Sequence, residues 1–204
     1  MKKSVLLAVV ATAALAVSAQ AQVCAGFPSS DRGFYFGGRV DFPEDVDSYG
    51  VEAAYNASGP GSLFGGLNVV SGEGGGEDVN VFRAGAALEL GLLGAMIGPQ
   101  ASICPVAEVN WFSENDVTAY AIPIGVGIGA ELGLPVGPSV SGYAVPALLI
   151  THGESFGDEE TSTDFSIRAG VNVGFGLITV GGEVNHVFED GGEPFFGIRF
   201  GVRL

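Results

Sequence analysis

The last nine residues of the chain alternate strictly between large apolar side chains and glycine or arginine. The apolar positions are Phe196, Ile198, Phe200, Val202 and Leu204, and the positions between them are Gly197, Arg199, Gly201 and Arg203. A period of two is the spacing of a β-strand with two chemically different faces. In a soluble sandwich the apolar face would meet a second sheet, whereas in a membrane barrel it would meet lipid and the arginines would face the interior.

The same period recurs through most of the chain, and we expect nine further strands from it. They span residues 33–42, 48–56, 62–70, 79–92, 100–112, 117–134, 139–151, 163–177 and 178–188, and the alternation is poorest in 139–151. Most have the length of about 9 to 11 residues that a tilted strand needs to cross a bilayer. Pro123 and Pro146 are expected to mark bulges or kinks. The sequence thus predicts an all-β fold, a single antiparallel transmembrane β-barrel of ten strands, or of eight if the second and third strands form one irregular hairpin.

The connections between these strands differ in charge according to their order. After the even-numbered strands, at 57–61, 93–99, 135–138 and the junction 176–178, they hold no acid and no base. After the odd-numbered strands, they hold 15 of the 23 acidic residues: Glu44, Asp45, Asp47, Glu73, Glu77, Asp78, Glu114, Asp116, Glu154, Asp158, Glu159, Glu160, Glu189, Asp190 and Glu193. A membrane barrel explains the split, because its periplasmic turns are short and its outer loops are longer and polar. An even number of strands also returns both termini to the periplasmic side.

The first 21 residues have the features of a secretory signal peptide. Lys2 and Lys3 precede an apolar run at 5–17, and residues 18–21 form a small-residue cleavage site of the A-x-A kind. The run is too short to span a bilayer, which takes about 20 residues. We therefore expect export, cleavage after Ala21, a periplasmic N-terminal segment at 22–31, and one barrel domain at 32–204 in the bacterial outer membrane.

Removal of residues 1–21 would leave a strongly acidic chain without lysine. Six arginines then face 23 acidic residues, a net charge of −17. Such a chain cannot neutralise phosphates, which excludes a nucleic-acid binder. Apolar residues make up 47% of the sequence, yet after the signal no continuous apolar run is long enough for a helix that spans a membrane. These residues must therefore be buried in another way.

The signal peptide, the alternating strands and the C-terminal strand together resemble the small outer-membrane β-barrel family, the OmpX/OmpA-like group often called porin-family proteins. In that family the last strand carries an insertion signal, with apolar residues at every second position and a terminal aromatic. The matching residues here are Phe196, Ile198, Phe200, Val202 and Leu204, so the chain departs from the pattern in ending on leucine. The resemblance implies the lipid bilayer and the outer-membrane insertion machinery as partners. It does not fix a function, since such barrels serve as pores, adhesins, enzymes and structural anchors.

Charged residues recur at the inward positions of the expected strands. They are Arg39, Arg83, Arg168, Arg199 and Arg203, together with Glu52, Glu89, Glu108, Glu131 and Glu183. A charge on the lipid face would cost about 2 to 4 kcal/mol at the midplane of the membrane, and the planar guanidinium pairs with carboxylates at two points. We predict an Arg–Glu network that fills much of the lumen. The alternative is that the interior is polar without a specific network.

Two cysteines in an exported chain favour one disulfide, Cys24–Cys104, over two free thiols. The bond would tuck residues 22–31 into or across the periplasmic mouth of the barrel. Gly125, Gly127 and Gly129 remove side-chain volume along one inward face. Either a bulky neighbour or backbone must fill that space, and the N-terminal segment offers the backbone.

Candidate catalytic and metal-binding groups are few. The two histidines, His152 and His186, lie near the expected extracellular rim, and alternation points His186 outward. We therefore assign no catalytic residue, cofactor or metal site. The acidic stretches 158–160 and 73–78 offer oxygen ligands for divalent cations, against simple solvation as the alternative.

We expect a non-enzymatic outer-membrane barrel, monomeric, that acts as a narrow pore or as a structural barrel. A first alternative is a surface module that binds divalent cations or partners through its acidic loops. A barrel enzyme and a soluble periplasmic β-protein are the remaining alternatives.

Overall fold

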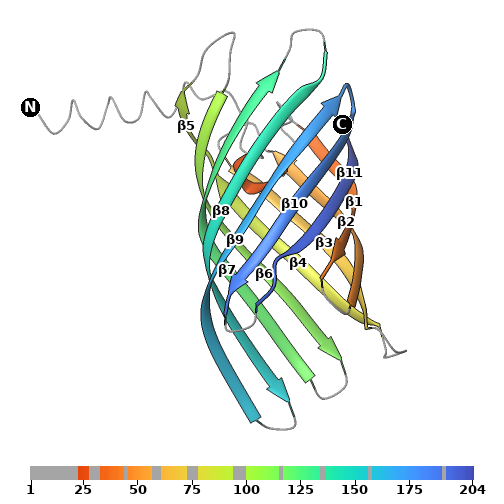
Figure 1. Ribbon diagram of the computed structural model, residues 1–204, viewed down its shortest axis with the longest axis vertical. Helices are drawn as coiled ribbons and strands as arrows, with labels where there is room; N and C mark the ends of the chain where they lie inside the picture. Colours follow the sequence, from red (N-terminus) through yellow and green to blue (C-terminus); the bar gives the residue numbers. More distant parts are fainter. Residues whose placement is uncertain are drawn as a thin grey trace, which may run out of the picture.

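The alternating segments form long antiparallel strands that join into one sheet (Figure 1). The computed structural model describes residues 23–27, 33–43, 46–56, 61–72, 78–93, 100–114, 117–133, 137–155, 158–189 and 192–204. The strands are β1 (Gly33–Phe42), β2 (Val46–Asn56), β3 (Gly61–Gly72), β4 (Val79–Leu88), β5 (Leu90–Leu93), β6 (Gln100–Glu114), β7 (Val117–Gly133), β8 (Ser139–Ser155), β9 (Asp158–Phe175), β10 (Ile178–Phe188) and β11 (Phe195–Arg203). The predicted signal peptide, residues 1–21, lies outside the described residues.

The sheet closes on itself into a barrel. All paired strands are antiparallel, β1 pairs with β11, and β4 pairs with β6. β4 and β5 lie end to end along β6 in one register, from Phe82 opposite Trp111 to Leu90 opposite Ile103, so together they make one strand of the barrel. The barrel therefore has ten strands, as predicted. The eight-stranded alternative is wrong, because β2 and β3 pair regularly along their lengths as two separate strands.

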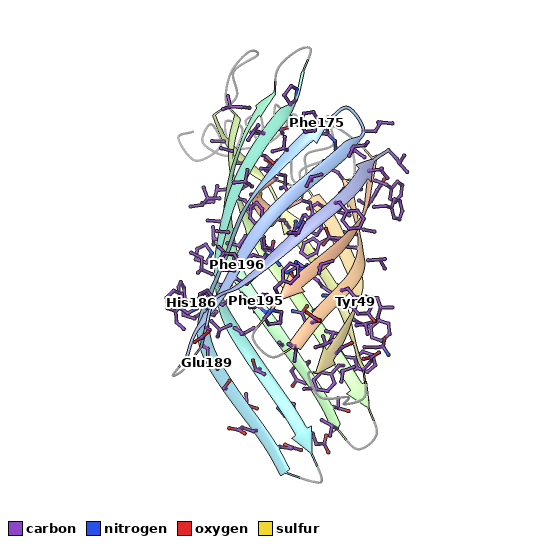
Figure 2. All side chains as sticks on the ribbon, turned by 45° about the vertical axis from the view of Figure 1, so that its right-hand side comes forward. Tyr49, Phe175, His186, Glu189, Phe195 and Phe196 are labelled. Carbon is purple, nitrogen blue, oxygen red and sulfur yellow. A yellow bond between two sulfur atoms is a disulfide. The ribbon has the colours of Figure 1, made fainter. Side chains whose placement is uncertain are left out.

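The two faces of the barrel wall have opposite chemistry. On the outer face, Ile198 and Phe200 of β11 are 50% and 56% exposed, and Tyr49 and Phe175, labelled in Figure 2, also belong to it. Arg199, which lies between Ile198 and Phe200 in sequence, faces inward and is 3% exposed. A soluble domain has the reverse arrangement, with apolar residues inside. The period of two in the sequence therefore predicted correctly which side chains face outward in this strand.

Strands β6 to β9 are longer than the others and extend past them at one end of the barrel (Figure 1). β8 and β9 stay paired as far as Ser155 opposite Asp158, and residues 156–157 connect them. The prediction of a long acidic loop at 152–162 is therefore wrong, because nearly all of these residues belong to strands. Their side chains are polar on both faces, so the sequence shows no alternation there even though the backbone pairing continues.

Pro123 and Pro146 do not mark bulges. The pairing of β6 with β7 has the same register on both sides of Pro123, and the pairing of β7 with β8 has the same register on both sides of Pro146. In each case only the pair of the proline itself and one pair next to it are missing. Proline has no N–H to donate to the ladder, which explains the missing pairs. The register shift that does occur lies between Gly91 and Leu93, where β5 pairs with β6.

The C-terminus lies at the end of the barrel that carries the uncharged connections (Figure 1). There the backbone N–H of Phe34 in β1 donates to the carbonyl of Leu204, and the N–H of Leu204 donates to the carbonyl of Phe34. The strand ends that border the acid-rich connections after β1, β3, β6 and β10 lie at the opposite end, together with the acidic ends of β8 and β9. None of the described helices is long and apolar enough to cross a membrane.

Candidate functional site: the filled interior of the barrel

The residues just after the predicted cleavage point lie inside the barrel. Val23–Ala25 form a short 3-10 helix, η1, and Gly26 and Phe27 follow it. Cys24 is bonded to Cys104 of β6, with their Cα atoms 6.1 Å apart, and both cysteines are fully buried. The predicted disulfide is thus present. Residues 23–27, called the plug below, pack into the lumen.

Glycines in β7 make room for the plug. A Cβ added to Gly127 would collide with the carbonyl of Cys24, and one added to Gly129 would lie 2.8 Å from the backbone nitrogen of Cys24. Of the two alternatives, a bulky neighbour or backbone, it is the backbone of the N-terminal segment that fills the space at both positions. Gly125 has another role, because it faces the carbonyl of Pro146 on the neighbouring strand β8.

Two arginines hold the carbonyls of the plug. Arg168 Nη2 donates to the carbonyl of Ala25 at 3.4 Å, and Arg199 Nη1 donates to the carbonyl of Gly26. Gly26 has a φ of 93°, a left-handed conformation that favours glycine. A Cβ at this position would also lie 2.8 Å from the ring of Tyr143. Backbone conformation and close packing therefore both require glycine at this turn.

Phe27 occupies the centre of the lumen. Its ring centroid lies 5.0 Å from that of Phe64 and 5.9 Å from that of Tyr35. The guanidinium carbons of Arg199 and Arg83 lie 5.4 Å and 5.9 Å from the same ring. A desolvated cation–π contact is worth up to about 2 kcal/mol. Phe27 therefore joins the plug to both the aromatic and the charged residues of the wall.

Glu183 of β10 is the centre of a first cluster of ion pairs. Its Oε1 lies 2.6 Å from Arg39 Nη2, and its Oε2 pairs with Arg199 Nη2. The hydroxyl of Tyr143 donates to the same Oε2. Arg39 Nε also donates to Asp41 Oδ2 at 2.6 Å. All four charged side chains are at most 8% exposed, so each of these charges is balanced by a partner and not by water.

Glu108 of β6 is the centre of a second cluster. Arg83 Nε lies 2.8 Å from its Oε1, and Arg168 Nη1 lies 3.2 Å from its Oε2. Glu52 joins the two clusters, because its oxygens lie 4.0 Å from Arg83 Nη1 and 3.8 Å from Arg199 Nε. The two clusters thus contain four arginines and four carboxylates. Removal of one partner from a buried ion pair strongly destabilises the folded protein, because the other charge stays buried without compensation.

The network contains most of the residues that the sequence predicted for it. Those that meet in the two clusters are Arg39, Arg83, Arg168, Arg199, Glu52, Glu108 and Glu183. Arg203 lies instead at the end of the barrel, where it donates to the carbonyl of Gly176 at 2.7 Å. Glu89 is buried on the interior side between the exposed Leu88 and Leu90, and Glu131 is half-buried in β7.

Other interior residues that the sequence did not single out also take part, among them Asp41, Tyr143 and Phe27. Asp41 lies on the same face of β1 as Arg39 by alternation, but its pairing with Arg39 was not anticipated. Tyr143 lies in the segment whose alternation is poorest, so no signal singled it out. Phe27 belongs to no alternating segment, and the large apolar side chain close to Cys24 was the feature that could have drawn attention to it.

A cavity of about 350 Å³ adjoins the ion pairs. Its lining residues are Arg39, Asp41, Pro43, Ser48, Asn68, Val70, Arg83, Glu108, Asn110, Arg168, Asn185 and Phe195. Pro43 follows β1 and Phe195 begins β11, so the cavity lies toward the end with the acid-rich connections. The lumen is thus filled by the plug and the two clusters, and the cavity lies beside the clusters on the acidic side.

The two histidines lie apart from this interior network. His152 Nδ1 lies 2.8 Å from Thr161 Oγ1 on β9, and its ring stacks on Tyr120 with centroids 4.8 Å apart. His186 lies on the same face of β10 as the exposed Phe188, 4.3 Å from its ring, and is labelled in Figure 2. The outward direction predicted for His186 agrees with this position.

The two acidic stretches considered for divalent cations do not form a cation site in the part of the chain that the structure describes. Residues 73–77 lie outside that part. Glu159 and Glu160 are neighbours in β9, so they point to opposite faces of the strand. No group of three His, Cys, Asp or Glu side chains that could hold a metal ion occurs among the described residues.

The comparisons with known proteins give no family. No protein-family model matches the chain, and no curated protein matches it. One solved structure that matches comes from a study of the mechanism behind the in-meso crystallisation of membrane proteins. It is 9% identical, the match covers 84% of each chain, and the TM-score is 0.35. A likeness at this level identifies neither a family nor a function.

Proposed function

We propose that this chain is an exported, non-enzymatic β-barrel of the bacterial outer membrane, and that its interior is closed by its own N-terminal segment. One observation carries the proposal: an ion-pair network fills a barrel whose outer face is apolar. Exposed apolar residues such as Phe36, Phe200 and Ile128 cover the outer face of the wall. In water they would form a contiguous apolar surface far larger than the few hundred Å² that is usual for monomers. In a bilayer the same wall meets hydrocarbon, and the closed sheet satisfies its own backbone groups.

The two ends of the barrel support one orientation. The uncharged connections and the C-terminus share one end, which suits the periplasmic side, and the acid-rich connections suit the outer surface. The last strand supports recognition by the insertion machinery, because Phe196, Ile198, Phe200 and Val202 form an exposed apolar row on its outer face. Lipid and this machinery are the partners that the proposal includes.

Of the two roles expected for such a barrel, a closed structural barrel fits the interior better than a narrow pore. The plug is tied to the wall by the Cys24–Cys104 disulfide, and Phe27 is 1% exposed at the centre of the lumen. An ion crossing the barrel would have to displace the plug or separate buried partners such as Glu183 and Arg199. Barrels of this size hold mostly side chains in their interior.

The test uses the mature chain, residues 22–204, refolded in detergent and reconstituted into phosphatidylcholine vesicles. We expect a gel mobility that changes on heating, flotation with the vesicles after a carbonate wash, and no steady conductance in a planar bilayer. A folded, monodisperse protein in the absence of detergent would contradict the membrane assignment. Discrete conductance steps from the folded barrel would contradict the closed interior and favour the pore.

A further inference from the structure

The cavity of about 350 Å³ beside the ion pairs combines a buried charged wall with access from the acid-rich end of the barrel. Arg39 and Asp41 of β1 belong to its wall and are 7% and 4% exposed. Pro43, which follows β1, and Phe195, labelled in Figure 2, also line the cavity and are only half-buried. Solvent therefore reaches the cavity from that end. Its volume lies in the range of sites that enclose small molecules.

Two buried polar atoms of this wall have no hydrogen-bond partner among the described residues. They are Nη1 of Arg39 and Oδ1 of Asp41. The remaining groups of these side chains are used, since Arg39 Nη2 lies 2.6 Å from Glu183 Oε1 and Arg39 Nε donates to Asp41 Oδ2 at 2.6 Å. Gly197, opposite Asp41 on β11, has no side chain to cover Oδ1, and a Cβ there would collide with it. Buried polar atoms of this kind favour a ligand that satisfies them.

The two atoms are neighbours, and they require groups of opposite charge. Nη1 of Arg39 is a positively charged donor, for which a carboxylate is the strongest acceptor. Oδ1 of Asp41 is a negatively charged acceptor, for which an ammonium group is a matching donor. An α-amino acid carries its carboxylate and its ammonium group on one carbon atom. A single small zwitterion therefore has the two groups that the two atoms require.

The surrounding charges disfavour a simple anion and a simple cation. Asp47 and Asp78 are exposed at the end from which the cavity is reached, and residues 22–204 carry a net charge of −17. This field repels a free anion on approach, whereas a zwitterion has no net charge. A free cation would instead meet three guanidinium groups in the cavity wall, those of Arg39, Arg83 and Arg168.

We propose that this cavity is a binding site for a small zwitterion of the α-amino acid class. Its carboxylate accepts a hydrogen bond from Arg39 Nη1, and its ammonium group donates to Asp41 Oδ1. The half-buried amides of Asn68, Asn110 and Asn185 line the same cavity and contact the rest of the ligand. This inference goes beyond the closed membrane barrel. It does not depend on it, because binding is measured on the folded protein in detergent micelles whatever the barrel conducts.

The probe is L-alanine, and its two matched controls are propionate, which lacks the ammonium group, and ethylamine, which lacks the carboxylate. The protein is the chain 22–204 with ¹⁵N-labelled arginine, whose six side chains give few Nε–H signals in a spectrum. At constant ionic strength we expect alanine to shift the Arg39 signal saturably. Each control should bind weaker by at least about tenfold, because it satisfies only one of the two atoms. Arg203, which donates to the carbonyl of Gly176 at the other end of the barrel, is the internal reference and should not shift.

Variants of the protein locate the ligand in the cavity. Val70 lines the cavity, so Val70→Phe fills part of it and should weaken alanine binding by at least about tenfold. Val69→Phe is the matched control, because the neighbouring residue of β3 points to the opposite face of the strand. Asp41→Asn removes the partner of the ammonium group and should bring the Kd of alanine close to that of propionate. Heat-dependent gel mobility confirms that each variant is folded.

The parent protein alone can overturn the zwitterion site. A titration with alanine that gives no saturable shift of the Arg39 signal would contradict binding in the cavity. Propionate that binds as tightly as alanine would mean that the cavity takes carboxylates and that Asp41 has no part in recognition. Undiminished binding by a folded Val70→Phe variant would place alanine elsewhere on the protein.

Discussion

The plug and the tip of the β8–β9 hairpin, residues 152–155 and 158–161, are held in opposite ways. The plug is buried, and its side chains at 23, 24, 25 and 27 are at most 2% exposed. It is held by a disulfide, by guanidinium groups on its carbonyls and by the rings around Phe27. The tip is held by its backbone ladder and by contacts such as that of His152 with Thr161. The comparison indicates that the barrel is stabilised from inside, and that its projecting end contributes less to stability than the interior does.

The same comparison separates two kinds of acidic residue. A carboxylate such as Glu183 is enclosed by arginines. Removal of the carboxylate or of an arginine leaves the other charge buried, without water or its partner. A carboxylate such as Glu160 is exposed, so water solvates its charge when a contact with another side chain is lost. The predictions below compare changes in the interior with matched changes on exposed positions.

The largest effect is expected from Glu183→Ala. The substitution leaves Arg39 and Arg199 buried without their shared carboxylate, and breaking a buried pair in this way costs about 3 to 5 kcal/mol. Urea unfolding of the barrel in detergent micelles measures the free energy of unfolding. Glu160→Ala on the hairpin tip is the control and should leave the urea midpoint unchanged. Equal midpoints for the two variants would show that the interior network is not a source of stability.

Removal of the disulfide tests the plug itself. In the Cys24→Ser, Cys104→Ser variant the link across a sequence separation of 80 residues is lost, and native disulfides of this kind contribute about 2 to 5 kcal/mol. The free energy of unfolding should fall by that amount. The plug is then held only by noncovalent contacts, so we expect brief conductance steps in a planar bilayer where the parent protein is silent. A variant as stable and as silent as the parent would mean that the disulfide does not hold the plug.

A single methyl group added beside the plug should lower the free energy of unfolding by less than removal of the disulfide does. In Gly127→Ala the new Cβ would collide with the carbonyl of Cys24, and overpacking of a filled interior costs about 1 to 3 kcal/mol. Gly182→Ala is a matched control, because nothing lies within 4 Å of a Cβ at that position on β10. The difference between the two urea midpoints isolates the collision. No difference would mean that the plug backbone can move away from β7 without loss.

The strands of the wall could be predicted from the sequence because a barrel gives each strand one apolar and one polar face. The predicted limits 33–42 and 178–188 coincide with β1 and β10. The prediction failed at 152–162, where the strands project beyond the apolar band and both faces are polar. Backbone pairing continues there without any signature in the order of the side chains.

The inward direction of the interior charges could be predicted, because a charged side chain on the lipid face of the barrel is costly. Their partners could not, since alternation gives the direction of a side chain but not its height along the barrel. Arg203 and Arg199 both face inward in β11, yet only Arg199 lies at the level of Glu183, while Arg203 reaches the carbonyl of Gly176 at the end. Height depends on the stagger between neighbouring strands, which the contacts of the whole sheet determine.

The smallest effect is expected from Tyr35→Phe. The Tyr35 hydroxyl donates to Glu52 Oε1 at 3.1 Å, and its ring lies beside Gly37 and Gly201, so the substitution removes one buried hydrogen bond and leaves the packing of the ring in place. The expected loss is about 1 kcal/mol in the free energy of unfolding. Tyr55→Phe is the control, because Tyr55 is 41% exposed on the outer face and should tolerate the change. If both variants unfold at the parent's urea midpoint, the Glu52 carboxylate is held by Arg83 and Arg199 alone, and the stabilising part of the interior is narrower than the full set of its polar contacts.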